Sequence, residues 1–280
     1  MTVNVERYCT RVTCDDGLSM AVDVYHPEQA ASELPTTILC HGFKGFRTWG
    51  MFPHIAKRLA QTGRAVVLFD YSHNGTDTVD DEFTRLDLFE KQTVSRHVED
   101  LGSVLSAIEE DEDMRSACSM DPTGIFAVGH SMGGGIAMMR AASDLRLAGL
   151  ACLNGVSYFD RIPDEAKSEL ETDGYVSIPN SRTGQIMRLG SPFFDDVSSI
   201  DLEAVADEVA VPTLILQGED DSVVLAPEGV ALADWIPGNV YFTVPGGDHT
   251  FGAKHPWAGW TDPLLLVVEQ LDAFLPANES

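Results

Sequence analysis

A serine flanked by glycines is the residue with the clearest chemical potential in this 280-residue sequence. The segment Gly129-His130-Ser131-Met132-Gly133 follows an apolar run at Ile125–Val128 and precedes a stretch with helical spacing. Gly-x-Ser-x-Gly between a buried strand and a helix is typical of a serine held in a strained turn with its hydroxyl exposed. The turn needs glycine on both sides because larger side chains would clash there. The motif predicts that Ser131 is a nucleophile, and the alternative is a glycine-rich turn with a passive serine.

A serine nucleophile needs a general base to take its proton, and two histidines near the C-terminus are candidates. His249 directly follows an expected strand at Val240–Val244, whereas His255 lies six residues further on, before Pro256. In parallel sheets the ligand-facing residues come from loops at the carboxyl ends of strands. We therefore expect His249 to be the base and His255 to be a surface residue or a contact of the insertion described below.

The base must be oriented by an acid, which in this strand–turn–helix arrangement lies between the serine and the histidine in the chain. The expected strand Thr213–Gln217 leads into Gly218-Glu219-Asp220-Asp221. We predict that Asp221 is the acid, with Asp220 as second choice. The alternative interpretation of this cluster is a solvated acidic loop in a very acidic protein.

A developing oxyanion requires two preorganised N–H donors. The residue after the nucleophile, Met132, supplies one, and the loop after the third expected strand supplies the other, which here is Phe43 in His41-Gly42-Phe43-Lys44-Gly45. We expect His41 to hold this loop in shape and His130 to be structural rather than catalytic.

These residues must be positioned by alternating strands and helices. Periodicity predicts strands at Thr10–Cys14, Leu18–Tyr25, Thr36–Cys40, Ala65–Phe69, Ile125–Val128, Leu147–Leu153, Thr213–Gln217 and Val240–Val244. It predicts helices at Met51–Thr62, Thr93–Glu110, Gly133–Ala142, Pro227–Trp235 and Pro263–Phe274. The first two strands flank Asp15-Asp16-Gly17, which is a hairpin signal, and Tyr71–Glu90 is expected to be a long loop.

Short apolar strands that alternate with amphipathic helices predict an α/β protein with a mostly parallel sheet covered on both faces. Residues 154–210 interrupt this rhythm, because they are polar, contain three prolines and have no clear strand pattern. We expect residues 1–153 and 211–280 to form the core and residues 154–210 to be a cap or lid inserted into it.

The charge balance excludes several kinds of partner. With 18 Lys and Arg against 44 Asp and Glu, the formal net charge is −26, so a nucleic-acid partner and an anionic membrane surface are not expected. Hydrophobic residues make up 44% of the chain, which argues against disorder. The extreme acidity and the small number of lysines favour a protein adapted to a salt-rich cytoplasm over an ordinary acidic protein. Nothing in the sequence decides between a monomer and a homo-oligomer.

Cysteine usage and the N-terminus indicate a cytoplasmic protein. Five cysteines is an odd number with no zinc-binding spacing, and we expect all five to be reduced. The N-terminal segment has no basic region followed by an apolar stretch, so no signal peptide is expected. The longest apolar run, Leu264–Val268, is far too short to span a bilayer.

Taken together, these motifs resemble the α/β-hydrolase superfamily over nearly the whole chain. Within it, the chain is most similar to the group of cinnamoyl and feruloyl esterases, serine aminopeptidase-like hydrolases and dienelactone-hydrolase-like proteins. The resemblance rests on His41-Gly42-Phe43, Phe69-Asp70-Tyr71-Ser72 and the Ser131 motif, in that order, with a short insertion after the sixth strand. It implies an eight-stranded sheet. Dienelactone hydrolases carry cysteine at the nucleophile, so Ser131 argues against that activity.

The resemblance implies hydrolysis of short-chain or aryl carboxylic esters through an acyl-enzyme, with a Ser131–His249–Asp221 triad and neither metal nor cofactor. Aromatic and aliphatic residues of the insertion are expected either to wall a small-molecule ester pocket or only to anchor the insertion; they are Tyr158, Phe159, Ile162, Tyr175, Ile178, Phe193 and Phe194. Three alternatives stay open: a peptidase or amidase, a coenzyme A thioesterase or acyltransferase, and a catalytically silent binding protein of the same fold.

Overall fold

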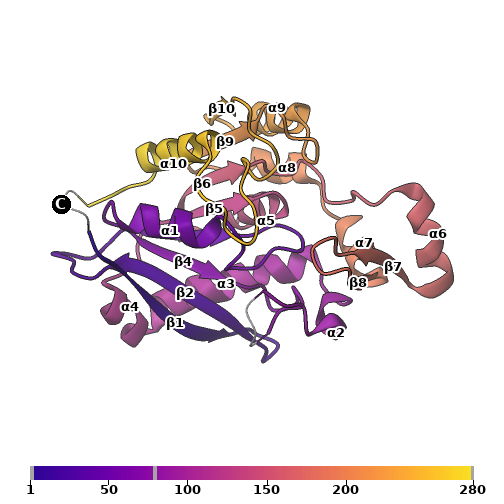
Figure 1. The fold of residues 1–280 in the computed structure, drawn as a ribbon, viewed down its shortest axis with the longest axis horizontal. Coiled ribbons are helices and arrows are strands. Elements are labelled where there is room, and N and C mark those ends of the chain that lie inside the picture. Colours follow the sequence, from indigo (N-terminus) through magenta and orange to yellow (C-terminus); the bar gives the residue numbers. More distant parts are fainter. Residues whose placement is uncertain (1–2, 78–80, 279–280) are drawn as a thin grey trace.

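An eight-stranded, mostly parallel sheet organises the protein, as the sequence predicts (Figure 1). The structure is a computed structural model that describes residues 3–77 and 81–278. The strands of the sheet lie in the order β1-β2-β4-β3-β5-β6-β9-β10. Their bounds are β1 Val5–Thr13, β2 Ser19–Pro27, β3 Thr36–Cys40, β4 Ala65–Phe69, β5 Ile125–His130, β6 Leu147–Leu153, β9 Thr213–Gly218 and β10 Val240–Val244.

The predicted hairpin forms one edge of the sheet. Strands β1 and β2 pair antiparallel, and β2 also runs antiparallel to β4, while the other strand pairs of the sheet are parallel. The turn between β1 and β2 contains Gly17 at φ 82°, a conformation that glycine adopts without steric cost. Every residue of β3 and of β4 is buried, which is the pattern of a parallel strand covered on both faces.

Helices cover both faces of this sheet. On one face α1 (Phe52–Ala60) and α10 (Asp262–Phe274) share a buried cluster, and on the other α3 (Val94–Glu110) and α5 (Met132–Ala141) share a second one. Helix α9 (Ala226–Trp235) packs on the face of α5. The side chains of Thr93 and Thr261 accept hydrogen bonds from the first turns of α3 and α10. These caps explain why both helices begin where the sequence predicts.

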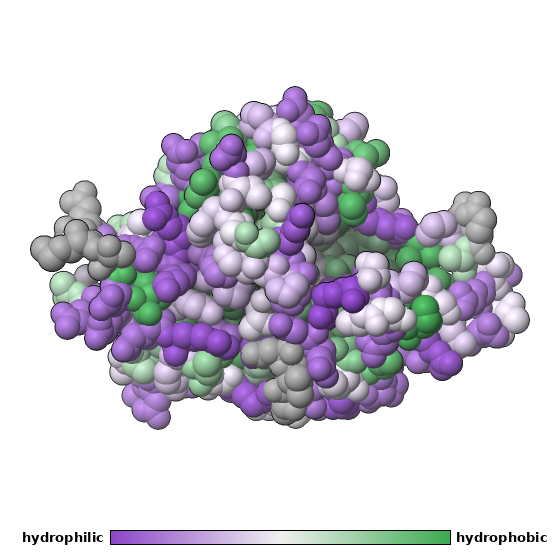
Figure 2. All heavy atoms as spheres, in the orientation of Figure 1, coloured by the Kyte–Doolittle hydropathy of each residue, from purple (hydrophilic) through white to green (hydrophobic). Residues whose placement is uncertain are grey.

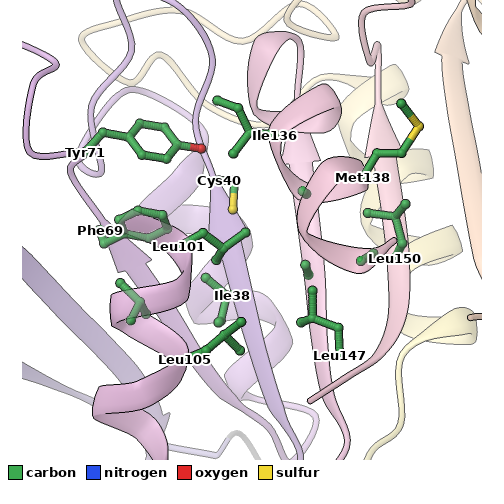
Figure 3. Close-up of a cluster of buried hydrophobic side chains, with 14 of the residues drawn as sticks. Ile38, Cys40, Phe69, Tyr71, Leu101, Leu105, Ile136, Met138, Leu147 and Leu150 are labelled. Atoms are coloured by element: carbon green, nitrogen blue, oxygen red, sulfur yellow. The ribbon is translucent and has the colours of Figure 1, made fainter. Parts of the chain in front are cut away.

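The core beneath the site is a tightly packed apolar cluster. Figure 3 shows Ile38 and Cys40 of β3 facing Leu101 and Leu105 of α3, with Ile136 of α5 above them. Each of these side chains is fully buried. Burying an aliphatic side chain of this size stabilises the fold by about 1.5–3 kcal/mol. The cluster therefore fixes the end of β3 relative to α5, the helix that begins directly after Ser131.

Residues 154–210 lie between β6 and β9 and extend to one side of the sheet (Figure 1). They contain α6 Asp164–Asp173, β7 Tyr175–Pro179, β8 Ile186–Gly190, α7 Ser191–Val197 and α8 Leu202–Asp207. The prediction that this segment has no strand was wrong, because β7 and β8 pair as an antiparallel two-stranded sheet. Each strand is only five residues long, and its buried face is completed by distant residues. Met187 of β8 packs with Phe83 and Phe89.

The helices of residues 154–210 were not predicted, and neither were two shorter helices elsewhere, α2 and α4. Helix α4 (Glu112–Cys118) follows α3 through Asp111, whose side chain caps it by accepting the N–H of Met114. Helix α2 (Leu86–Phe89) lies within the segment that was expected to be an irregular loop from Tyr71 to Glu90. Residues 78–80 of that expected loop lie outside the described residues. Helix α2 has only four residues, which is too few to give a helical period in the sequence.

Candidate active site

Ser131 lies in the sharp turn between β5 and α5. It has φ 56° and ψ −123°, a conformation that side-chain-bearing residues rarely adopt. The flanking glycines are required by space: a Cβ on Gly129 would lie 2.1 Å from the carbonyl oxygen of Gly133, and a Cβ on Gly133 would lie 2.4 Å from that of Cys40. The turn therefore has the geometry expected from the Gly-x-Ser-x-Gly motif.

His249, in the loop after β10, lies beside Ser131. Its Nε2 is 3.1 Å from Ser131 Oγ, and its Nδ1 is 2.8 Å from Asp221 Oδ2. A carboxylate only accepts hydrogen bonds, so His249 donates from Nδ1 and its Nε2 is free to accept the proton of the Ser131 hydroxyl. The structure thus brings together the three side chains that the sequence singled out as nucleophile, base and acid.

Two backbone N–H groups of the loop after β9 hold the side chain of Asp221 in place. Its Oδ1 accepts the N–H groups of Val223 at 2.8 Å and Val224 at 2.9 Å, and its side chain is fully shielded from solvent. Burial by itself raises the pKa of Asp221, but the hydrogen bonds from His249 and these two amides outweigh it and lower the pKa below its usual range. Asp221 is therefore ionised at neutral pH. Asp220, the second choice from sequence, is exposed.

Asn154 positions the His249 loop and was not predicted from the sequence. Its Nδ2 donates to the carbonyl oxygens of Asp248 at 3.1 Å and His249 at 3.0 Å, and its Oδ1 accepts the N–H of Gly218 at 2.6 Å. This fully buried side chain therefore connects the ends of β6, β9 and β10. The signal available in the sequence was an asparagine directly after a buried strand, where the chain leaves the sheet edge.

His130 supports the same loop from the other side. Its Nε2 donates to the carbonyl oxygen of His249 at 2.7 Å. Burial, together with the neighbouring His249, lowers the pKa of His130 to about 3. Burial likewise lowers the pKa of His41, whose Nδ1 donates to the carbonyl oxygen of Gly42 at 2.9 Å. Both imidazoles are neutral at pH 7 and make structural contacts, in agreement with the expectation from sequence.

His255 has partners of its own away from the Ser131–His249–Asp221 contacts. Its Nδ1 accepts the N–H of Gly50 at 3.0 Å, and its Nε2 lies 3.4 Å from a carboxylate oxygen of Asp81. These contacts connect the loop after β10 to the loop between β3 and α1 and to the segment after β4.

The backbone of the loop after β3 lies against Ser131. A Cβ on Gly42 would lie 2.9 Å from Ser131 Cβ, so only glycine allows this approach. In the described part of the chain, the N–H groups of Phe43 and Met132 donate to no protein acceptor. Met132 is the first residue of α5, where the N–H has no partner within the helix. These two donors are available to a ligand atom next to Ser131.

Two cavities meet at Ser131. One, of about 410 Å³, has predominantly apolar walls, to which the insertion contributes Tyr158, Phe159, Ile162, Ile178 and Phe193. The space-filling view shows hydrophobic surface in the hollow between the sheet and the insertion (Figure 2). Two residues expected in the same wall, Tyr175 and Phe194, do not line it. Tyr175 packs under the guanidinium of Arg188, and Phe194 packs against Phe193.

The second cavity, of about 370 Å³, also adjoins Ser131 and has more polar walls than the first. Its walls include Trp49, Phe52 and Phe83, together with Lys44 from the loop after β3 and residues 180–182 of the turn between β7 and β8. Phe43, Lys44, Ser131 and His249 line both cavities, so a substrate bound at Ser131 can place one part in each.

Within residues 3–77 and 81–278, no cluster of three or more His, Cys, Asp or Glu side chains is arranged to hold a metal ion. In the same residues, no helix has the length and apolar character needed to cross a membrane. All five cysteines are free thiols.

Comparison with known proteins adds the family. A model described as "Alpha/beta hydrolase family" matches residues 37–276. No curated protein matches the chain. Solved structures do: Est1E from Butyrivibrio proteoclasticus with ferulic acid bound has a TM-score of 0.73 at 21% identity, covering 95% of this chain and 97% of that one. GrgF from Penicillium sp. sh18, an alpha/beta hydrolase, has a TM-score of 0.73 at 17% identity, covering 95% and 97%.

A dienelactone hydrolase from Anabaena variabilis has a TM-score of 0.62 at 15% identity, covering 96% of each chain. At these identities the likeness shows a shared fold and does not transfer any activity to this chain.

Proposed function

The chain belongs to the alpha/beta hydrolase family, and from this premise we propose that it is a serine hydrolase that cleaves carboxylic esters through an acyl-enzyme. The observation that carries the proposal is the unbroken chain of contacts from Ser131 Oγ to His249 at 3.1 Å and on to Asp221 at 2.8 Å, placed where two cavities meet. Nucleophile, base and orienting acid in this relation are the requirements for activating a serine.

In the proposed mechanism, Ser131 Oγ attacks the ester carbonyl while His249 Nε2 takes the hydroxyl proton. Asp221 holds the imidazole in the required tautomer and stabilises its positive charge. The N–H groups of Phe43 and Met132 bind the developing oxyanion. His249 then gives its proton to the leaving alkoxide, and the alcohol departs from the acyl-enzyme. Water attacks the acyl-enzyme by the same proton route, which releases the carboxylic acid and restores Ser131.

We propose that residues 154–210 act as a cap that shapes the substrate site, because this segment supplies much of the apolar wall beside Ser131. That wall suits a short acyl chain or an aromatic ring. Est1E, which shares the fold at 21% identity, binds ferulic acid, an aromatic carboxylic acid. We therefore propose short-chain or aryl esters as the substrate class.

The test uses purified protein with p-nitrophenyl butyrate and with a fluorophosphonate probe, which labels activated serines. We expect the wild type to hydrolyse the ester and to become labelled. Ser131→Ala should lower kcat by about 10⁶-fold and abolish labelling. Ser143→Ala, an exposed serine just beyond α5, is the matched control and should leave both signals intact.

Two results would overturn the proposal. Labelling that persists in Ser131→Ala means that another residue is the nucleophile. If the wild type neither hydrolyses any short ester nor reacts with the probe, the protein behaves as a non-catalytic binding protein of this fold. A parallel assay with the matched p-nitroanilide separates an esterase from an amidase, and we expect the ester to react faster.

A further inference from the structure

The more polar of the two cavities beside Ser131 has no carboxylate side chain in its wall among residues 3–77 and 81–278. The chain contains 44 Asp and Glu among 280 residues, so such a wall is unusual for this protein. Two cationic side chains line it, namely Lys44 from the loop after β3 and Arg182 from the turn between β7 and β8. In a protein with a net charge of −26, two cations and no acid among the described wall residues are a local reversal of the overall charge.

Both cations have donors that no acceptor among the described residues uses. The ammonium group of Lys44 has three donors, and its contact in the structure is with the carbonyl oxygen of Pro179 at 3.2 Å. Arg182 donates to the carbonyl oxygen of Asp81, and its guanidinium packs over the ring of Phe46 at 5.3 Å. Among the described residues, neither cation forms an ion pair with a carboxylate.

Arg161 in the apolar cavity shows the opposite arrangement. It also lies near Ser131, but its guanidinium is paired with the carboxylate of Glu228 and donates to the carbonyl oxygen of Val223. Its charge is therefore neutralised inside the protein. The cations of the polar cavity differ from Arg161 in having no such partner among the described residues.

Asn180 provides an independent observation in the same cavity. Its side chain is 6% exposed, and its Nδ2 has no hydrogen-bond partner among the described residues. The Oδ1 atom accepts the N–H of Arg182 at 3.1 Å, which fixes the orientation of the amide and leaves the NH₂ group as the unpaired end. An unpaired buried donor costs free energy, which a partner supplied by a bound ligand would offset.

We propose that this cavity is a subsite for a carboxylate, so that the preferred substrates are carboxylic esters carrying a second, free carboxylate on the part of the molecule that enters it. Lys44 and Arg182 donate charged hydrogen bonds to that carboxylate, and Asn180 adds a neutral one. The uncharged part of the ester occupies the apolar cavity. Hydrolysis adds water across the ester bond and leaves the second carboxylate unchanged. This inference rests on the proposed esterase function, which it narrows to a substrate class.

The carboxylate of Asp81, whose carbonyl oxygen accepts from Arg182, does not pair with either cation. Its carboxylate is already engaged by Thr48 at 2.7 Å and by His255 at 3.4 Å. Burial also lowers the pKa of Lys44, as expected for a cation that has been desolvated without a counter-charge. A bound carboxylate would supply that counter-charge.

The experiment compares two ester pairs that differ in one carboxylate. In the first pair, monomethyl adipate carries the free carboxylate on the acyl side and methyl hexanoate lacks it. In the second pair, carboxymethyl butyrate carries the free carboxylate on the alcohol side and propyl butyrate lacks it. For the wild type we expect the carboxylate member of at least one pair to have the higher kcat/KM, despite the acidic surface. Lys44→Met and Arg182→Met should each lower the ratio of the two kcat/KM values about tenfold, the size expected for a lost charged hydrogen bond.

Lys57→Met on α1 and Arg188→Met on β8 are the charge-matched controls, since both residues are exposed and neither lines the cavity. These variants should keep the wild-type ratio, which separates a local contact from a change in overall charge. An enzyme that cleaves the neutral esters equally well, with a ratio that Lys44→Met and Arg182→Met leave unchanged, would overturn the subsite while leaving the esterase function standing.

A binding measurement distinguishes failure of the proposed esterase function from failure of the proposed carboxylate subsite. Calorimetry with Ser131→Ala and uncleaved carboxymethyl butyrate or monomethyl adipate measures the subsite without any reaction. Affinity for either ester that weakens about tenfold in the Ser131→Ala/Lys44→Met double variant supports the subsite even if the wild type hydrolyses nothing. Absence of detectable binding of both esters to Ser131→Ala, in a protein that also shows no hydrolysis, overturns it.

Discussion

At the scale of single residues, the candidate site is a set of side chains carried by the ends of adjacent strands. Ser131 follows β5, Asp221 follows β9 and His249 follows β10, and all three strands end at the same edge of the sheet. Asn154 follows β6, which lies between β5 and β9, and its amide connects the loops on either side. Parallel pairing aligns these strand ends, so residues more than a hundred positions apart in the chain come within hydrogen-bond distance.

The first prediction separates two neighbouring acids. Asp221→Asn keeps the shape of the side chain but removes the negative charge that fixes the His249 tautomer. We expect kcat on p-nitrophenyl butyrate to fall by about 10⁴-fold, the effect of this change in a serine triad. Asp220→Asn, one residue earlier and exposed, should stay close to wild type. The opposite result, with Asp220 essential and Asp221 dispensable, would remove Asp221 from the mechanism.

The second prediction concerns the stability of the neutral, buried His130. Its pKa is about 3 in the folded protein and about 6.5 in an unfolded chain, so between these values only the unfolded state binds the proton. Stability is therefore lost as the pH falls through this window, and His130 alone subtracts about 2 kcal/mol between pH 7 and pH 5. Urea unfolding of His130→Gln should show a pH dependence that is weaker by about this amount. An unchanged dependence would mean that His130 is not the titrating group.

At the scale of elements, the insertion decides the walls of the site. Strands β7 and β8 and helix α7 bring Ile178, Leu189 and Phe193 to the apolar cavity, and the β7–β8 turn brings Asn180 and Arg182 to the polar one. The hairpin is held by Met187 packing with Phe83 and Phe89 of the segment after β4. The long segment Tyr71–Glu90 therefore has a structural role that its polar composition conceals.

The third prediction uses two adjacent phenylalanines of α7. Phe193 lines the apolar cavity, whereas Phe194 packs against the Phe193 ring and does not line the cavity. Phe193→Leu should enlarge the cavity and raise the ratio of kcat/KM for p-nitrophenyl octanoate to that for the butyrate by several-fold, because a methylene group in such a pocket contributes about 1–3 kcal/mol. Phe194→Leu is the control and should leave the ratio unchanged. Equal effects of the two substitutions would place the acyl chain elsewhere.

At the scale of the whole molecule, the net charge of −26 must be accommodated by the folded state. Hydrophilic residues cover much of the face shown in Figure 2, and the sheet and its buried clusters are those of an ordinary hydrolase. Mutual repulsion of surface carboxylates destabilises the compact state at low salt. The acidity is thus mainly a property of the surface, apart from Asp221 and the few acids in buried contacts.

The fourth prediction follows from this repulsion. In about 1 M KCl the Debye length falls to about 3 Å and surface charges are largely screened. The melting temperature should therefore rise by several degrees between 0.1 and 2 M KCl. Sucrose at matched osmolality, which does not screen charge, should have a smaller effect. A melting temperature that stays flat or falls with KCl would contradict adaptation to a salt-rich cytoplasm.

Local patterns in the sequence were enough to predict the sheet and the candidate nucleophile, base and acid. The apolar runs of β3 and β4 are buried throughout and β6 almost throughout, so they carry their own signal, and Gly129 marks a turn whose space requirement comes from the nearby Gly133. The hairpin β7–β8 was missed because its strands are short and their burial depends on Phe83 and Phe89, far away in the sequence.

Only the tertiary structure decided what surrounds Ser131. It separated Phe193, which lines the apolar cavity, from Phe194, which does not, although the two are adjacent in the chain. It also placed Lys44 against Pro179, which lies 135 positions further along, and so assembled the cationic wall. A strand or a turn depends on neighbours two to four residues away, whereas a cavity wall is built from segments that meet only after the chain has folded. Local sequence patterns therefore determined the main sheet and the candidate nucleophile, base and acid, whereas packing between distant elements determined the β7–β8 hairpin and the shape and charge of the site.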